Sequence, residues 1–119
     1  MRSLVIKCTA GAEAPERCNQ AFTVAAAGVA AGAQVSLWLT GEAAWFAVPG
    51  RAEEFHLDLA TPLAELRDVV LHGGMLTVCS QCAARRDLTA ESVLPDVRIA
   101  GAAGFVEEAL VDSAQALVY

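Results

Sequence analysis

Cys79 and Cys82 are the residues of this chain whose type and spacing are best suited to chemistry. They form a CxxC motif in the segment MLTVCSQCAARR, residues 75–86. The apolar run before Cys79 predicts a strand, and the residues from Ser80 onward predict a helix. Free N–H groups and the dipole at a helix start can lower a thiol pKa below its ordinary value of about 8.5. We therefore predict that Cys79 is a nucleophilic thiolate, and that Cys82, one turn later, can attack a sulfur bonded to it.

Other roles stay open for the residues of this segment. Cys82 could be a small buried apolar residue on the inner face of the helix, and so could Cys79. Arg86 is a candidate auxiliary residue because it adds positive charge. It lies two turns beyond Cys79, however, roughly 10 Å along the helix axis. A cation in the last turn of a helix also stabilises the helix dipole without any contact to the thiol.

Cys8 and Cys18 are further candidate auxiliary residues. Cys8 ends a predicted strand and Cys18 lies early in the next predicted helix, so both are expected near the edge of the fold that carries Cys79. They could be packing residues or additional thiols of the site. Structural zinc usually needs two closely spaced ligand pairs, and these two cysteines are ten residues apart. We therefore predict no metal, although four thiolates could still converge in space. With a single glycine in the loop TAGAEA, no nucleotide or other cofactor is predicted either.

Short apolar runs alternate with helical stretches along the chain. Strands are predicted at residues 4–8, 34–40, 75–79, 96–100 and 115–119. Helices are predicted at residues 15–32, 61–74 and 80–86 and from Gly101 onward, with a short helical turn in 41–50. Strands separated by helices are joined by crossovers, which makes the sheet parallel, with helices on both faces. The prediction is a three-layer α/β/α fold with a five-stranded parallel sheet, whose chemistry collects at the carboxyl ends of the strands.

Some local features are more specific expectations. Thr61 is predicted to cap its helix, and FHLDL, within residues 51–60, could be an edge strand or a loop. Spacing predicts two buried helix faces: Leu63, Leu66, Val69 and Val70 on one helix, and Phe105, Val106, Ala109 and Leu110 on another. The strands read as continuous apolar runs, which is typical of strands covered on both faces.

Length and composition restrict the class of protein. The 119 residues fit one domain, residues 1–119, and 55% of them are hydrophobic, so the chain can build a real core. The net charge is −6, and the only basic cluster is Arg85-Arg86. Nucleic acid is therefore not expected as a partner, because phosphate neutralisation needs a basic face.

Residues 18–41 contain no charged side chain and are long enough to raise the question of a membrane span. Polar residues and two glycines interrupt this stretch, and its halves differ. The first half is Ala-rich and helical, whereas the second is β-branched and alternating, so we interpret it as a helix, a turn and a strand. No membrane partner is expected. The N-terminus does not resemble a signal peptide, and four cysteines then indicate a reduced, cytoplasmic protein.

The whole chain resembles the DsrE/DsrF-like family of small α/β proteins, which includes TusD-like sulfur-relay subunits. The resemblance depends on the opening strand LVIKCT, the helix start Pro15-Glu16-Arg17, the segment AAGAQVSLWLTGEAAWFA, the segment VCSQCAARR and the ending IAGAAGF with ALVY. The core formed by Cys79, Ala83 and Arg86 looks like the active-cysteine segment of the relay members. The family glycine after the arginine is Asp87 here, and Cys82 is not part of that core.

The resemblance implies a five-stranded parallel three-layer fold, homo-oligomers such as trimers or hexamers, and a cysteine that carries sulfur as a persulfide. The first hypothesis is therefore a sulfur carrier with sulfurtransferase-like persulfide transfer, in which Cys79 takes sulfur from a donor protein and gives it to an acceptor. The second is a peroxiredoxin-like dithiol protein that uses Cys79 and Cys82. The third is a non-catalytic assembly subunit with inert thiols.

Overall fold

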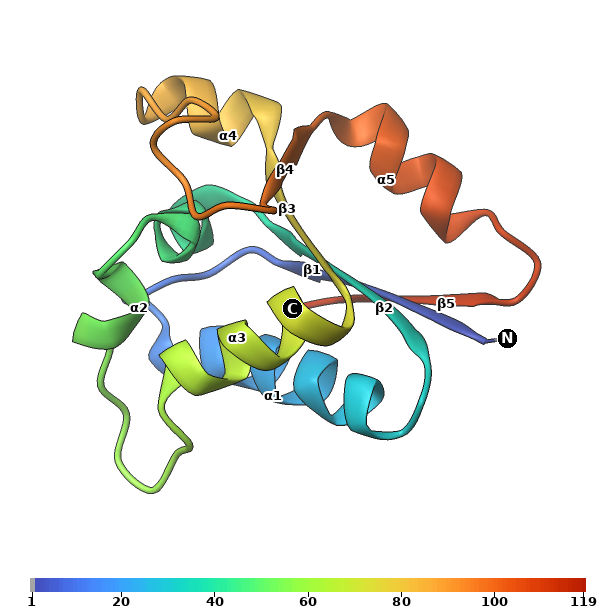
Figure 1. Ribbon diagram of the computed structural model, residues 1–119, viewed down its shortest axis with the longest axis horizontal. Coiled ribbons are helices and arrows are strands. Elements are labelled where there is room, and N and C mark those ends of the chain that lie inside the picture. Colours follow the sequence, from blue (N-terminus) through green and yellow to red (C-terminus); the bar gives the residue numbers. More distant parts are fainter. Residues whose placement is uncertain (1) are drawn as a thin grey trace.

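The alternation of apolar runs and helical stretches produces five strands separated by helices. The computed structural model describes residues 2–119 (Figure 1). The elements in chain order are β1 Ser3–Cys8, α1 Pro15–Ala30, β2 Gln34–Leu39, the 3-10 helix η1 Gly41–Ala47, α2 Arg51–Glu54, α3 Leu63–Gly73, β3 Met75–Cys79, α4 Ser80–Arg85, β4 Arg98–Ala100, α5 Ala102–Ala109 and β5 Ala114–Val118.

The strands form one sheet with the order β4-β3-β2-β1-β5, and every neighbouring pair is parallel. This arrangement confirms the predicted five-stranded parallel sheet. The first strand in the chain pairs with both β2 and β5, so β1 lies inside the sheet, while β4 and β5 form its two edges. The connection through α5 must therefore cross the sheet from one edge to the other.

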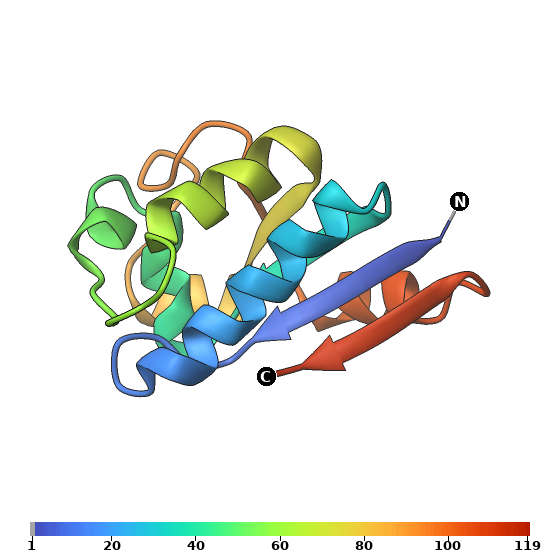
Figure 2. The ribbon, with the colours of Figure 1, turned by 90° about the horizontal axis from the view of Figure 1, so that it is seen from below.

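Helices cover both faces of the sheet, as the predicted three layers require. α1 and α3 lie side by side on one face, and α5 lies on the other (Figures 1 and 2). The main core lies beneath α1 and α3, where Phe22 packs over Leu37 and Leu39 among other buried residues. A methyl group on Gly28 of α1 would come within 2.9 Å of Val35. A glycine there lets the helix approach the sheet closely.

The segment after η1 differs from its prediction. Arg51–Glu54 form the one-turn helix α2, and the residues of FHLDL that follow belong to no strand. α2 is held by Arg67 of α3, whose side chain is only 5% exposed and donates to both carboxylate oxygens of Glu53 at 3.1 and 2.9 Å. A short helix with one buried residue, Ala52, leaves little periodicity for sequence analysis to detect.

Two details of α3 were predicted incorrectly. Pro62, not Thr61, is the residue before the first turn, and no side chain caps this helix. Val69 is 41% exposed, although the spacing placed it on the buried face. Arg67 is buried in its place because its guanidinium has carboxylate partners, Glu53 and Asp68. An ion pair has thus overridden the apolar pattern.

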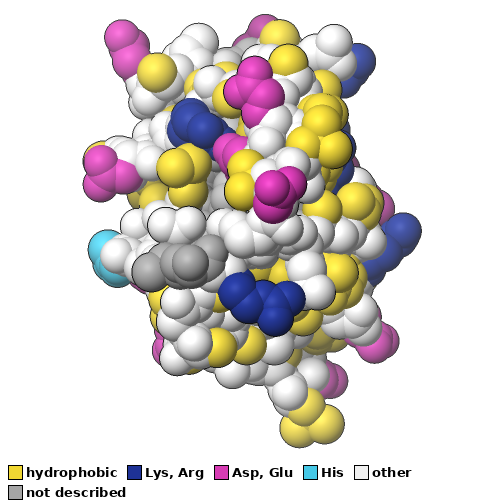
Figure 3. All heavy atoms as spheres, turned by 90° about the vertical axis from the view of Figure 1, so that its right-hand side faces the viewer, with side chains coloured by type: hydrophobic (Ala, Val, Ile, Leu, Met, Phe, Trp, Pro, Cys, Tyr) yellow, Lys and Arg dark blue, Asp and Glu magenta, His cyan; other side chains and the backbone are white. Residues whose placement is uncertain are grey.

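The face that α5 covers is thinly protected, which corrects the predicted burial of this helix. Val106 and Leu110 are 49% and 76% exposed, because α5 is one short helix lying across a wide sheet. Its contacts to the sheet are Phe105, edge-on to Trp38, and Glu108, which accepts hydrogen bonds from Ser36 and Trp38 and pairs with Arg98. Figure 3 shows apolar side chains lying open between acidic ones on the side that carries α5 in Figure 1.

β5 is also less covered than its apolar sequence predicted. Leu117 and Val118 are exposed, and the strand has a partner, β1, on one side only. Within residues 2–119, no helix is both long and apolar enough to span a bilayer. The uncharged stretch from Cys18 to Gly41 is divided between α1 and β2, as predicted.

Candidate functional site

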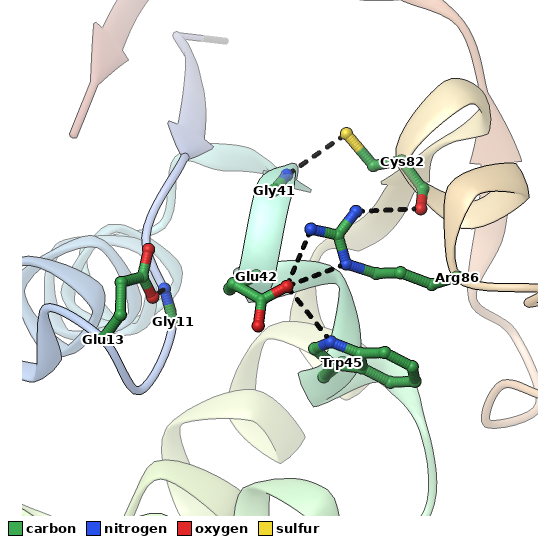
Figure 4. Close-up of polar contacts among 7 residues, drawn as sticks. All are labelled: Gly11, Glu13, Gly41, Glu42, Trp45, Cys82 and Arg86. Atoms are coloured by element: carbon green, nitrogen blue, oxygen red, sulfur yellow. Dashed lines mark hydrogen bonds and ion pairs between the residues drawn. The ribbon is translucent and has the colours of Figure 1, made fainter.

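The carboxyl edge of the sheet brings together the segments that follow the strands. β3 ends at Cys79, which is also the residue that precedes the first turn of α4. η1 follows β2 at the same edge, and α4 contacts it. The loop after β1 packs against η1 as well, since a methyl group on Gly11 would lie 2.7 Å from the carbonyl oxygen of Glu42. Figure 4 shows how these segments meet.

Cys79 is partly exposed at this edge. Partial burial raises the pKa of its thiol, but the N–H groups of Cys82 and Gln81, the Cys82 side chain and the Lys7 ammonium together lower the pKa further than burial raises it. The sulfur makes no close capping hydrogen bond to α4, so the amides act on it mainly as dipoles. The net effect is a pKa below the ordinary value, which favours the thiolate.

Cys82 lies one turn into α4 and is 9% exposed. Its sulfur accepts a hydrogen bond from the backbone N–H of Gly41, with 3.2 Å between nitrogen and sulfur (Figure 4). Gly41 adopts a left-handed conformation, with φ of 55°, at the start of η1. The strand-to-helix turn after β2 therefore aims an amide at the second sulfur of the CxxC motif.

Arg86 lies at the end of α4 and turns away from Cys79. Its guanidinium donates to the carbonyl oxygen of Cys82 at 3.1 Å and to Glu42 Oε2 at 3.0 and 2.7 Å. Trp45 donates to the same Glu42 oxygen at 3.3 Å (Figure 4). Arg86 thus satisfies a free carbonyl at the helix C-terminus and links α4 to η1, rather than contacting the sulfur of Cys79.

Cys8 and Cys18 form a second pair of neighbouring thiols, and both are 0% exposed. The Cys8 thiol donates to the carbonyl oxygen of Ala10 at 3.2 Å and approaches that of Cys18 at 3.9 Å. The neighbouring Cys8 side chain raises the pKa of Cys18 far above its ordinary value, and burial raises it further. Cys18 therefore stays protonated within the core.

The register of the sheet keeps the two pairs on opposite faces. Cys8 pairs with Leu39, and Leu39 pairs with Val78. Successive side chains of a strand point to opposite faces, so Cys8 shares a face with Val78, and Cys79 belongs to the other. Within residues 2–119, no three Cys, His, Asp or Glu side chains come close enough to hold a metal ion.

A cavity of about 360 Å³ opens beside the Glu42 carboxylate. It is lined by Ala12, Glu42, Trp45, Phe46, Arg51, Glu54 and Phe55. The guanidinium of Arg51 lies over the Trp45 ring at 4.4 Å. The cavity reaches η1 and α2 but not the two sulfurs of the CxxC motif.

Three contributors to the site were missed by sequence analysis. Gly41 and Glu42 follow β2 at the edge where Cys79 ends β3, so the rule for carboxyl ends of parallel strands could have indicated them. Lys7 was detectable as a lone charge near the end of an otherwise apolar strand. Their actual contacts depend on the pleat and on the turn at Gly41, which a linear pattern does not reveal.

The fold and the site define a small three-layer α/β protein with an acidified thiol at the carboxyl edge of a parallel sheet. The model of the DsrE/DsrF-like family matches residues 2–117, and the chain belongs to this family.

Among solved structures, the chain is similar to the YchN protein from E. coli, with a TM-score of 0.82, 14% identity and coverage of 100% of both chains. At this identity the similarity establishes a shared fold and not a shared activity. A comparison with curated proteins finds no match.

Proposed function

We propose that the protein is a sulfur carrier that holds sulfane sulfur as a persulfide on Cys79. The observation that carries this proposal is the environment of the thiol. Cys79 is accessible at the carboxyl edge, and the start of α4 and Lys7 favour its anion. The thiolate, not the thiol, is the nucleophile in sulfur transfer. Membership of the DsrE/DsrF-like family supports sulfur chemistry of this kind.

The transfer step needs no external oxidant or reductant. The Cys79 thiolate attacks the outer sulfur of a donor persulfide, RSSH, and a bond forms between Sγ and that sulfur. The S–S bond of the donor breaks, and its electron pair leaves with the thiolate RS⁻. The proton of the outer sulfur stays on the product, Cys79–S–SH. An acceptor thiolate then takes the outer sulfur in the same way, and Cys79 returns as a thiolate.

A dithiol redox activity is the second candidate, favoured by the position of Cys82. The Gly41 N–H group stabilises a negative Cys82 sulfur one turn from Cys79. In this scheme, a peroxide oxidises the Cys79 thiolate to the sulfenic acid and releases hydroxide. The Cys82 thiol then attacks that sulfur, forms the disulfide and releases water. In the carrier scheme the same attack on Cys79–S–SH would release HS⁻.

The setting of this activity is part of the proposal. We place the protein in the cytoplasm, where its four free cysteines would remain reduced, and we propose donor and acceptor proteins as its partners. We also propose a homo-oligomer, a trimer or hexamer. The exposed apolar residues of α5 and β5 support it, because such surfaces often mark interfaces. Light scattering of the purified chain would measure the mass, and a monomer at all concentrations would refute the oligomer.

The experiment that tests the carrier function is persulfide loading in the absence of air. The protein is incubated with a low-molecular-weight persulfide donor, and intact mass and alkylated peptides are measured. We expect the wild type and Cys82→Ser to gain one sulfur atom, located on Cys79. Cys79→Ser should gain none. A sulfur atom on Cys82 instead, or no gain in the wild type, would overturn the proposal.

The same variants separate the redox candidate from the carrier. After mild peroxide treatment, a dithiol enzyme should lose two free thiols and form the Cys79–Cys82 disulfide, and either substitution should abolish that disulfide. Redox behaviour that is unchanged in Cys82→Ser would exclude the dithiol mechanism. An inert assembly subunit would show slow alkylation of Cys79 and neither product.

A further inference from the structure

Lys7 is a charged residue in a strand that is otherwise apolar and internal to the sheet. It lies on β1 between β2 and β5, in register with Trp38 and Val118. Within residues 2–119, no carboxylate forms a salt bridge with its ammonium. Placing a half-buried cation on a sheet without a counterion costs free energy, so a purely structural role explains it poorly.

The geometry directs this cation toward the Cys79 site. The Lys7 nitrogen lies 4.2 Å from the centre of the Phe105 ring, and that ring packs edge-on against Trp38 of the neighbouring strand. The side chain of Lys7 therefore leans from β1 across β2. Phe105 lies in the first turn of α5, whose start at Gly101 lies close to Ser80, next to Cys79.

The register allows the separation to be bounded. Lys7 is in line with Trp38, and Trp38 with Thr77, so Cys79 lies two strands across and two residues further along, on the same face. With strands about 4.8 Å apart and a rise of about 3.4 Å per residue, the two α-carbons are roughly 12 Å apart. A lysine side chain reaching over β2 covers about half of that distance. At the remaining separation, a charge acts through its field rather than by contact.

We propose that Lys7 is a positioning residue for Cys79: its ammonium, held against Phe105, supplies the positive field that retains the anionic sulfur and draws an anionic persulfide to the edge. The inference deepens the proposed carrier function and rests on it. It also assigns the donor a chemical class, a persulfide in its anionic form, because a cation that touches neither sulfur can discriminate only by charge.

The surrounding charges leave this field largely uncancelled. On the same face, Arg98 of β4 and Glu108 of α5 neutralise each other. At the edge, Glu42 of η1 is occupied by Arg86 beyond α4. Lys7 is then the unpaired cation facing the thiol, in agreement with its lowering of the pKa of Cys79 after the opposing effect of burial and the helix amides.

The test measures the rate of Cys79 alkylation by iodoacetamide against pH in the wild type, Lys7→Met and Lys7→Arg. We expect Lys7→Met to react about threefold to tenfold more slowly near neutral pH, and to match the wild type at high pH where the thiol is fully ionised. Lys7→Arg should restore the wild-type profile. Added salt should reduce the difference, because it screens a field between separated charges.

Arg85→Met is the matched control, since it removes one positive charge from the exposed end of α4. An equal shift in Arg85→Met, or a Lys7→Met profile that equals that of the wild type, would overturn the proposal. Circular dichroism distinguishes a loss of folding from a loss of field. Loading with an anionic persulfide gives an independent readout: a wild type that loads no sulfur refutes the carrier function, whereas the alkylation profile still decides the role of Lys7.

Discussion

Cys8 and Cys79 both end strands of one parallel sheet, at one edge, and each has a second cysteine in the following helix. Their surroundings are nevertheless opposite. Cys8 faces the core beneath α1, where it and Cys18 are closed off from solvent. Cys79 belongs to the other face, is partly exposed and lies at the start of α4. The pleat of the sheet, not the sequence motif, separates the two pairs.

The difference shows which features make a thiol chemically useful. Proximity of two sulfurs is present in both pairs. What the Cys79 pair adds is access, helix amides, and the Gly41 N–H that holds Cys82. At the Cys8 pair, hydrogen bonds to carbonyl oxygens favour the protonated thiol instead. The same residue type is therefore nucleophilic at one place and inert packing at the other.

The largest expected effect is on thiol reactivity in the native state. Iodoacetamide should modify Cys79 at least about 1,000-fold faster than Cys8 or Cys18, because the buried pair reacts only through opening of the fold. Alkylation over time with peptide mapping measures both rates. In denaturant, all four cysteines should react at similar rates, which is the control. Comparable native rates would abolish the distinction between the pairs.

The same substitution in each pair should have unequal effects on stability. Cys18→Ser places a hydroxyl in a fully buried site and should lower the free energy of unfolding by about 1–3 kcal/mol. Cys82→Ser should cost less than about 1 kcal/mol, because its oxygen can still accept the Gly41 N–H bond. Urea unfolding followed by circular dichroism measures both. Equal losses would mean that Cys82 belongs to the core as fully as Cys18 does.

The pH dependence of Cys79 sharpens the electrostatic part of the comparison. Because its folded pKa is lowered, the alkylation rate should rise at lower pH than for the same thiol in the unfolded chain, since only the thiolate reacts. A depressed pKa also means that the folded state gains stability above the unfolded pKa and loses that gain as pH falls through the folded pKa. A rate profile with the midpoint of an ordinary thiol would contradict this.

The smallest expected effect concerns the link behind the open pair. Glu42→Gln removes the charge that Arg86 holds, and since the pair is partly exposed, the loss of stability should be below about 1 kcal/mol. Arg86 holds the pKa of Glu42 below its usual range. The wild type should therefore exceed the variant above the ordinary carboxylate pKa, and this advantage should vanish as pH falls through the lowered value. Thermal unfolding at several pH values measures the difference.

The layers and the strand positions could be predicted from the sequence because each strand is a short apolar run bounded by helical periodicity. The prediction failed where a single contact outweighed the pattern. Arg67 is buried because Glu53 meets it from α2, and Val69 is exposed as a result. Leu110 is exposed because one helix cannot cover the face alone. Such outcomes depend on partners that lie far away in the sequence.

The candidate site was predictable to a similar extent. The strand-to-helix junction at Cys79 follows from local sequence, and so does its place at the carboxyl edge. The bond from Gly41 to Cys82 and the lean of Lys7 across β2 do not, because they combine three strands through the sheet register. Local sequence identifies the reactive atom, whereas tertiary structure determines the charges around it.

The pairing of β1 with β5 has a consequence for how the chain folds during synthesis. Residues 3–8 emerge from the ribosome early, yet one hydrogen-bonding edge of that strand waits for residues 114–118. A nascent chain that is still missing β5 therefore exposes an apolar strand edge, which can pair with another chain. Contacts of such long sequence separation also form slowly. Chaperone binding is therefore expected to concentrate on nascent chains that have not yet released their last strand.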